Sequence, residues 1–328
     1  MTDLVSVASN AVQSYQRALG TVSNNIANVG TEGYSRQEVV LVANPVSKVG
    51  TLYLGTGVTV DTVKRQYDTF AEANLRNSNS DLTSQEPMVT YANRVIDIMG
   101  SSSMGLSGAL DQFFNAARDL SSDPASTVMR GSFLRDSENL AARFDELSGQ
   151  LDLVQSETDE ALKSYVNSMN TTFKQLAAVN VQLTKQKSAD LQPADLLDQR
   201  DVLLKDLSGY AQIKTGFAEN GAVTVSLGQS LTRDVVVDGL NYFMLGTNFN
   251  SAAPEKVSLV LDPYGNATPL TGLSGGKLAG IIDFGQVDPG IPGPAAQIFG
   301  FGRRRADQRH PDRRLFQRAQ RQIGRAHV

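Results

Sequence analysis

The stretch that decides the fold is Asn24-Asn25-Ile26-Ala27-Asn28-Val29-Gly30-Thr31-Glu32-Gly33-Tyr34-Ser35-Arg36-Gln37. Asparagine and glycine are unfavourable inside a helix, and their density here ends any helix that precedes. Residues 31–34 are typical of a turn, in which Gly33 is free to adopt a positive φ. After the turn, Val39, Leu41 and Ala43 alternate on one face. The stretch therefore predicts a helix that gives way to a strand-like arm at a fixed point.

Residues 4–29, which lead into this stretch, carry a heptad pattern. Apolar or small residues form its seam: Leu4, Val5, Ala8, Ala11, Val12, Tyr15, Ala18, Leu19, Val22, Ile26 and Val29. A heptad seam implies a left-handed packing partner, and one such helix is marginal alone in water. Two interpretations stay open. The segment is a core helix of a globular domain, or a terminal helix that stays unfolded until a partner helix or a neighbouring subunit arrives.

The next part of the chain is strand-rich and then helical. Residues 38–66 contain short alternating runs bounded by glycines, and they end in the order Val63-Lys64-Arg65-Gln66-Tyr67-Asp68. Residues 69–99 have helical periodicity, and Pro87 is expected to break or kink that helix. Residues 107–120 form another helix. Ser122 or Asp123 is then expected to cap the following one, with Pro124 in its first position.

Residues 125–187 predict one very long helix, because apolar residues recur at threes and fours without a proline. A short helix through residue 207 follows, opened by Asp195-Leu196-Leu197-Asp198-Gln199-Arg200-Asp201. Three aspartates spaced by three could suggest a metal or acid–base site. However, successive threes drift around a helix, and residues 1–302 contain no histidine. We interpret the aspartates as a negatively charged helix start with exposed charge pairs, for which Arg200 and Lys205 are the partners.

From residue 211 the pattern changes to a period of two. Turn signals lie at 219–221, 238–239 and 262–266, each beside runs of β-forming residues. The glycine-rich 272–277 segment lacks the spacing and the Ser/Thr of a phosphate loop, and we interpret it as a loop that leads into residues 277–284. The fold class predicted is therefore mainly α with a β subdomain: a heptad helix, long coiled-coil-like helices, then an antiparallel β unit.

Composition limits the function. The chain has 328 residues, 41% of them hydrophobic, and no cysteine, so disulfides and thiolate metal sites are excluded. Residues 1–302 hold 21 basic and 32 acidic residues, a net charge of −11, which argues against a nucleic-acid or anionic-membrane partner. No segment has the pattern of a membrane span or of a cleavable signal peptide. We predict no catalytic, cofactor or metal site.

Residues 285–328 differ from the rest. Three prolines fall within 289–294, and nine arginines and both histidines of the chain follow. The last six residues read like a translated sequencing adapter. We interpret this basic tail as a frameshift or adapter artefact.

Four stretches resemble the flagellar axial proteins (rod, hook and hook-associated proteins). They are the 24–37 run after a heptad helix, the 63–68 order, the 113–124 order and the 195–201 order. The last two and the Tyr34-Ser35-Arg36-Gln37 ending resemble the hook-associated type found at the first hook–filament junction. The resemblance covers about the N-terminal half of such proteins and stops after Phe284.

The resemblance implies a structural subunit that is exported unfolded by the flagellar type III apparatus, without a cleavable signal, and assembles outside the cell. The implied partners are further copies in a ring or tube layer, the hook protein, a second junction protein, and an export chaperone that binds the C-terminal part lacking here. The implied assembly residues are Asn24, Asn25, Ala27, Asn28, Gly33, Tyr34, Ser35, Arg36 and Gln37, with Leu4, Val5, Ala8, Val12, Tyr15, Leu19, Val22 and Ile26 as the helix seam.

Three alternatives were weighed. A hook or distal rod protein shares the asparagine run, but the 195–201 order and the long helix favour the junction type. A cell-wall hydrolase would need a nucleophile–histidine pair or placed carboxylates, which residues 1–302 lack. A nucleic-acid binder would depend on the basic tail alone.

The chain is expected to divide into four parts: 1–37 for the axial helix and turn, 38–208 for the helical domain with a β arm, 209–284 for the β region, and 285–328 for the tail.

Overall fold

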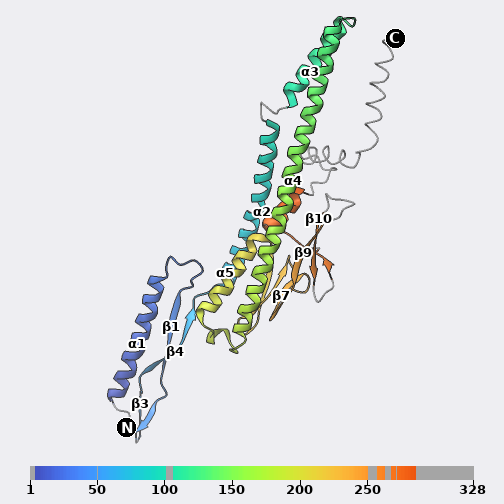
Figure 1. Ribbon diagram of the computed structural model, residues 1–328. Coiled ribbons are helices and arrows are strands. Elements are labelled where there is room, and N and C mark those ends of the chain that lie inside the picture. The colour runs from blue at the N-terminus through green and yellow to red at the C-terminus, as the bar shows by residue number, and fades with distance from the viewer. Residues whose placement is uncertain are drawn as a thin grey trace. The chain divides into compact units, whose positions relative to one another are not determined.

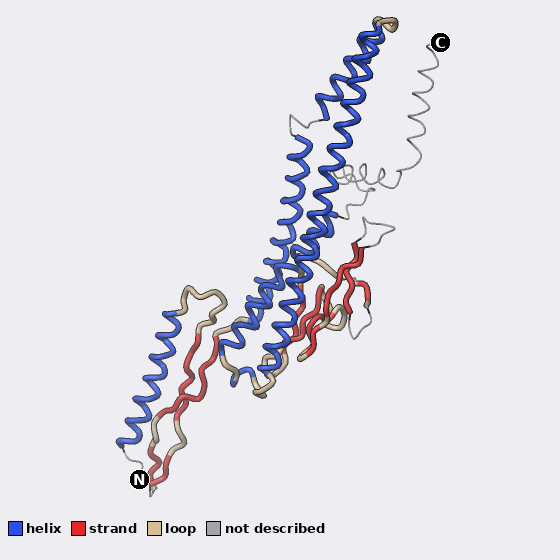
Figure 2. Tube along the Cα trace, in the orientation of Figure 1, coloured by secondary structure: helices blue, strands red, loops and turns tan. Residues whose placement is uncertain are grey.

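The computed structural model describes residues 4–49, 51–100, 106–249, 257–262, 267–270 and 272–285 (Figures 1 and 2). The predicted fold class, mainly α with a β subdomain, is confirmed, because the described residues form long helices together with antiparallel sheets. Most of the suspect tail lies outside the described residues. The elements are α1 Leu4–Ala27, β1 Gln37–Ala43, β2 Ser47–Val49, β3 Leu52–Leu54, β4 Val58–Arg65, α2 Thr69–Gly100, α3 Leu106–Ser122, α4 Thr127–Leu183, a 3₁₀ turn Ala189–Leu191, α5 Ala194–Tyr210, β5 Ile213–Phe217, β6 Val223–Leu227, β7 Val235–Asp238, β8 Asn241–Tyr242, β9 Met244–Phe249, β10 Val257–Asp262, β11 Thr268–Pro269 and α6 Gly276–Gly285.

The chain divides into two compact units. The first holds residues 1–84, 165–249 and 258–279, and the second holds residues 85–164, 250–257 and 280–328. Helices α2 and α4 are each divided between the two units, so that one part of each helix belongs to the first unit and the other part to the second. The four-part division expected from the sequence stays a prediction.

In the first unit, residues 4–66 form what we call the N-terminal arm. Helix α1 packs on the antiparallel pair β1–β4, in which Val39 faces Val63 (Figure 1). The buried hydroxyl of Ser14 donates to the Asn10 carbonyl (2.8 Å) and lies 3.3 Å from the Val58 carbonyl. The packing partner of α1 in the described chain is thus the β1–β4 hairpin rather than another helix, which does not fit the first of the two open interpretations, a core helix of a globular domain.

The rest of the first unit combines helix and sheet. Strands β5-β6-β7-β8 form one antiparallel sheet in that order, and β11-β10-β9 form a second. The last part of α4 buries Met169, Phe173, Leu176 and Leu183 completely, while Leu204 and Leu207 of α5 are also fully buried. These side chains form the apolar interior of this unit, and the hairpin turns expected at 219–221 and 238–239 are confirmed.

Two asparagines of α4 hold strand backbones as another strand would. The amide nitrogen of Asn180 donates to the carbonyls of Val223 (2.8 Å) and Gly239 (2.6 Å), and its amide oxygen accepts from the Val223 N–H (2.9 Å). Asn170 makes the same two-way exchange with Leu245, at 2.8 Å in each direction. Because Asn180 is completely buried, its bonds replace water for the buried backbone groups of Val223 and for the half-buried Gly239 carbonyl.

The second unit has its own core. Val95 and Ile98 of α2 pack with Val154 of α4 and with Phe284, and the rings of Tyr91 and Phe284 lie 5.5 Å apart. Helix α4 runs from Thr127 to Leu183 without interruption, as the 125–187 periodicity predicts.

Two local expectations are corrected. Of the break or kink expected at Pro87, the break does not occur, because Pro87 lies buried inside the continuous helix α2, and the kink stays a prediction. The missing hydrogen bond, which costs about 3 kcal/mol in an isolated helix, is offset here by packing of the residues that follow. The cap of α4 is Ser126, whose hydroxyl accepts from the Met129 N–H (3.4 Å), because residues 123–126 first close a turn of their own.

Candidate functional site

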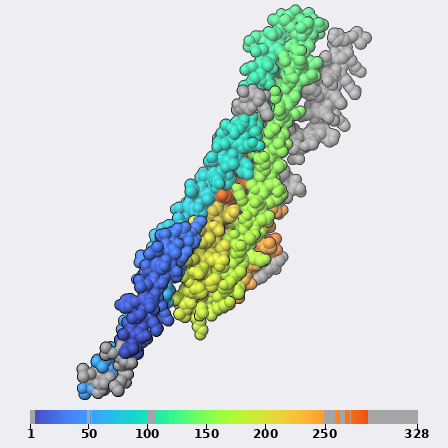
Figure 3. Space-filling model, turned by 60° about the vertical axis from the view of Figure 1, so that its left-hand side comes forward, coloured from blue at the N-terminus to red at the C-terminus, as the bar shows by residue number. Residues whose placement is uncertain are grey.

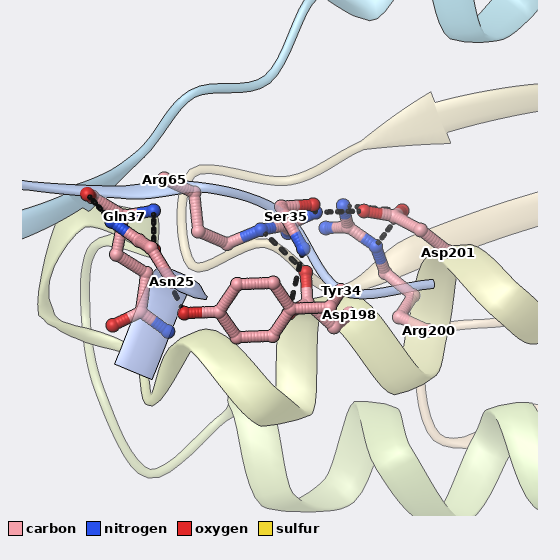
Figure 4. A network of polar contacts seen from close by, with 8 residues as sticks. All are labelled: Asn25, Tyr34, Ser35, Gln37, Arg65, Asp198, Arg200 and Asp201. Atoms are coloured by element: carbon pink, nitrogen blue, oxygen red, sulfur yellow. Dashed lines mark hydrogen bonds and ion pairs between the residues drawn. The ribbon is translucent and has the colours of Figure 1, made fainter. Parts of the chain in front are cut away.

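The three sequence signatures of the first unit meet in one polar network. Figure 4 shows Asn25 at the end of α1, the turn residues that follow it, Arg65 at the end of β4, and three charged residues of α5. The members are Asn25, Tyr34, Ser35, Gln37, Arg65, Asp198, Arg200 and Asp201. The fold thus brings the 24–37, 63–68 and 195–201 stretches together, although they are far apart in the sequence.

Asn25 closes the turn. Its amide nitrogen donates to the Gln37 carbonyl (2.8 Å), and its amide oxygen accepts from the Gln37 N–H (2.9 Å) and the Tyr34 hydroxyl (2.9 Å). Gly33 has φ +79°, and a Cβ there would lie 2.1 Å from Cγ2 of Val202 on α5. The turn therefore depends on Asn25 for its closure and on Gly33 for its close approach to α5.

Arg65 is the centre of the network. Its Nε lies 2.9 Å from Oδ1 of Asp198 as an ion pair without hydrogen-bond alignment, and its Nη2 donates to Oδ2 of Asp201 (2.7 Å). The same nitrogen donates to the Ser35 hydroxyl (3.0 Å). The Arg65 side chain is 7% exposed and both carboxylates are 11% exposed, so water screens these charges weakly.

Arg200 completes the arrangement on α5. It donates to Oδ1 of Asp201 through Nε (2.9 Å) and Nη2 (2.7 Å), and through Nη1 to the Gly221 carbonyl (2.6 Å). Its guanidinium also lies 4.6 Å from the centre of the Phe217 ring. Asp201 is thus held between two arginines, and Arg200 links α5 to the β5–β6 turn.

The interpretation of 195–201 as an exposed charged helix start is wrong for two of its aspartates. Asp195 is exposed, but Asp198 is buried and pairs with Arg65. Arg200 does pair with Asp201 as expected, whereas Lys205 pairs instead with Glu32 of the turn (2.6 Å). The error arose because the decisive partner, Arg65, comes from another element. Of the other members, Leu197 is buried, Leu196 is half-buried and Gln199 is exposed.

The remaining turn residues contribute through their backbone and, for Asn28, through local side-chain bonds within the turn. The carbonyl of Asn24 accepts from both the N–H and the side-chain amide of Asn28, at 3.0 Å each. The carbonyl of Arg36, whose side chain is exposed, accepts from the Gln66 N–H (2.8 Å), and Ala27 is exposed at the end of α1. Their side chains are therefore outside the network.

The heptad seam of α1 lies on the surface. Val5, Val12, Tyr15, Leu19, Val22 and Ile26 are 52% to 71% exposed, and Ala8 is exposed too. The helix meets the hairpin through another face, which includes Val7 and Ser14. We call the six exposed apolar residues the α1 stripe, and Figure 3 shows α1, in dark blue, at the surface. For Leu4, only its place at the start of α1 is described.

Sequence reasoning missed Arg76 as a buried partner of this region. It is 4% exposed on α2, and its Nη2 lies 3.5 Å from the Thr215 hydroxyl. Burial, followed by the charge of Asp201, raises the pKa of the Tyr67 phenol, and the nearby positive charge of Arg76 acts in the opposite direction. The only sequence feature that could have revealed the burial of Arg76 is its position on the inward face of α2. Helical periodicity alone does not distinguish a buried arginine from an exposed arginine at such a position.

This pKa shift predicts how Tyr67→Phe behaves in alkali. A phenol whose pKa is raised on folding contributes stability that is present below the ordinary value of 10.0 and is lost as the pH rises through the folded pKa. The parent should therefore keep the stability difference from Tyr67→Phe that it has at neutral pH up to the ordinary value of 10.0, and lose stability relative to the variant as the pH rises above that value. Urea denaturation on both sides of that value measures the difference. Parallel stability curves for the two proteins would contradict the prediction.

Among the described residues, we find no helix both long and apolar enough to cross a membrane, and no group of three His, Cys, Asp or Glu placed to hold a metal ion. The arrangement of charges at Arg65 is instead that of a junction between two parts of a protein.

Comparison with known proteins identifies two family matches. Residues 6–34 match the flagella basal body rod protein family, and residues 92–296 match the family described as flagellar hook-associated protein FlgK helical domain. The second match extends into the segment that we interpreted as a tail artefact. The rod-type match covers α1 and the turn, which contains the Asn25 and Gly33 contacts.

Individual relatives agree with these matches. Flagellar hook-associated protein 1 of Salmonella typhimurium is 29% identical over 294 residues, which is 88% of this chain and 52% of the relative. The Bacillus subtilis protein of that name is 29% identical over 271 residues, 80% of this chain and 53% of the relative. The chain thus spans about half the length of these curated relatives. The solved structure of the flagellar hook junction protein FlgK from Burkholderia pseudomallei covers 64% of this chain and 38% of its own, with a TM-score of 0.57 and 21% identity, and shares the fold.

The two family matches place the chain among the proteins of the bacterial flagellum. Within that class, the chain belongs to the FlgK family of flagellar hook-associated proteins, whose helical-domain pattern spans more than half of its residues.

Proposed function

We propose that this chain is part of a structural subunit at the junction of the flagellar hook and filament. Membership of the FlgK family supports this role, and so does the name hook-associated protein 1 carried by its relatives. The proposal includes export without a cleavable signal, assembly outside the cell, and no enzymatic activity. Its partners would be further copies, the hook protein and a second junction protein, with an export chaperone bound by the C-terminal part.

The observation that carries this proposal is the exposed α1 stripe. Six apolar side chains along one helix are unfavourable in water, and a contiguous apolar surface of this kind marks an interaction site. A heptad seam on the surface would be buried when α1 meets a helix of the assembled tube. We therefore propose the stripe as the packing surface between subunits and the 24–37 turn as its connection to the outer domain.

Leu19→Asp is expected to abolish incorporation without unfolding the chain, because Leu19 is 68% exposed. A charge in a buried seam would remain unpaired, which excludes it from a packed interface. The substitution is made at the gene's own locus, and incorporation is measured by swimming in soft agar and by antibody detection in purified hook–basal bodies.

Gln16→Asp is the matched control, since Gln16 is an exposed polar residue of the same helix. It should leave swimming and incorporation unchanged. Normal incorporation of Leu19→Asp would show that the stripe is not the packing surface. If neither Leu19→Asp nor Gln16→Asp were incorporated, the result would indicate a general intolerance of negative charge on α1.

A further inference from the structure

Ionic contacts join the N-terminal arm to α5 and to the turn that precedes it. Lys205 pairs with Glu32 (2.6 Å), Lys64 pairs with Asp190 (3.5 Å), and Arg65 pairs with two aspartates of α5. The first two pairs have side chains 44% to 78% exposed, whereas the Arg65 cluster is 7% to 11% exposed. Exposed pairs add little and are screened by salt, so among these ionic contacts the buried cluster is the one that can fix a geometry.

The geometry of this cluster is restrictive. A guanidinium is planar, and Arg65 offers Nε to one carboxylate and Nη2 to the other, three residues apart on α5. Ser35 adds a second tie from the turn, because its N–H donates to Oδ2 of Asp198 (3.3 Å) while its hydroxyl accepts from Arg65. Figure 4 shows Arg65 extending past Ser35 toward Asp201. Rotation of the arm about α5 would break these contacts together.

The two parts that the cluster joins have separate sources of stability. The arm is held by α1 packed on β1 and β4, and the body by the buried residues of α4, α5 and the sheets. A buried ion pair adds little net stability, because desolvation offsets its attraction, but in some proteins it selects one geometry among several.

We propose that Arg65, Asp198 and Asp201 form a registry lock, which sets the direction of the N-terminal arm relative to α5 and adds little to folding. The lock holds the α1 stripe in one orientation. Only the use of that orientation in assembly rests on the proposed function, because the orientation is a property of the isolated chain.

The test replaces the lock by apolar side chains and measures the arm's direction. Arg65→Met with Asp198→Leu removes one charge of each sign and leaves Asp201 paired with Arg200. Because the chain has no cysteine, nitroxide labels can be attached at cysteines introduced at exposed positions. Labels at the exposed positions Gln16 on α1 and Gln182 on α4 give the distance between the N-terminal arm and the rest of the first unit, which pulsed electron paramagnetic resonance measures.

We expect the double variant to melt within about 3 °C of the parent, because apolar replacement of a buried ion pair is close to neutral. We expect its distance distribution between 16 and 182 to change from one narrow peak to a broad one. Labels at Gln16 and Asp61 lie within the arm, and their distribution should stay narrow. Glu32→Gln with Lys205→Gln removes the exposed pair and should leave the arm–body distribution unchanged.

A narrow arm–body distribution in the folded double variant would overturn the lock. If the double variant instead loses its fold, so that the distribution between 16 and 61 also broadens, Arg65→Lys decides the question. Lysine keeps the charge but cannot reach both carboxylates as a planar fork. The lock then predicts a broader arm–body distribution for Arg65→Lys with a normal arm, and an unchanged distribution would refute it. Because no assembled flagellum is involved, failure of this test is distinguishable from failure of the Leu19→Asp experiment.

Discussion

Asn180→Ala should lower the free energy of unfolding of the first unit by about 3–5 kcal/mol, since two buried backbone groups of Val223 and the half-buried Gly239 carbonyl lose their hydrogen-bond partner at once. Each unsatisfied buried donor or acceptor costs about 1–3 kcal/mol. The N–H and carbonyl of Val223 and the carbonyl of Gly239 would face alanine's methyl group instead of an amide. The loss exceeds what one side-chain contact usually contributes, because one residue serves three groups.

The measurement is native-state hydrogen exchange, read at the Val223 amide, which donates directly to Asn180, and at Val225 of the same strand. Exchange at these amides should accelerate strongly in the variant. Asn167→Ala is the matched control, because Asn167 is an exposed asparagine of the same helix, and its replacement should change stability by less than about 0.5 kcal/mol. Equal effects of the two substitutions would show that the Asn180 contacts contribute little.

The elements predicted correctly are those whose signal is local. The β5–β6 hairpin follows from Asn220-Gly221, where Gly221 adopts φ +85°, and the long α4 follows from its periodicity. Both depend on residues that are close in the sequence, so one chain suffices to find them. Ser126 shows the limit of local reasoning, since the two expected cap residues, Ser122 and Asp123, lie before a turn that ends at Ser126, and Ser126 caps the helix instead.

The candidate site could be predicted only in part. Its three stretches were recognised, but nothing in their spacing showed that Arg65 would reach Asp198, because periodicity carries no information on which distant elements meet. For the same reason, Asp198 was expected to be an exposed charge on the surface, whereas it is buried. Asn180 was missed for a related reason: an asparagine on the buried face of a helix becomes meaningful only once a strand backbone lies opposite.

Gly276→Ala should destabilise the first unit by about 4 kcal/mol or more, because strain and overlap act together. Gly276 begins α6 with φ +69°, and an added Cβ would lie 2.2 Å from the carbonyl carbon of Tyr210 and 2.3 Å from the nitrogen of Ala211. Both neighbours are backbone atoms at the end of α5, so no side-chain rotation can relieve the overlap.

The overlap and the strain can be separated by a second substitution. Asparagine tolerates positive φ better than alanine does, so Gly276→Asn relieves part of the strain and retains the Cβ. It should therefore remain nearly as destabilising as Gly276→Ala in urea denaturation followed by circular dichroism. Gly209→Ala is the control on α5, because its Cβ would meet only the Asn79 side chain at 3.6 Å, and helix propensity should make it neutral or stabilising by about 0.5–1 kcal/mol. If Gly276→Asn restored the parental stability, strain rather than overlap would be the reason for glycine at this junction. If Gly276→Ala itself were neutral, α5 and α6 would approach less closely than the structure shows.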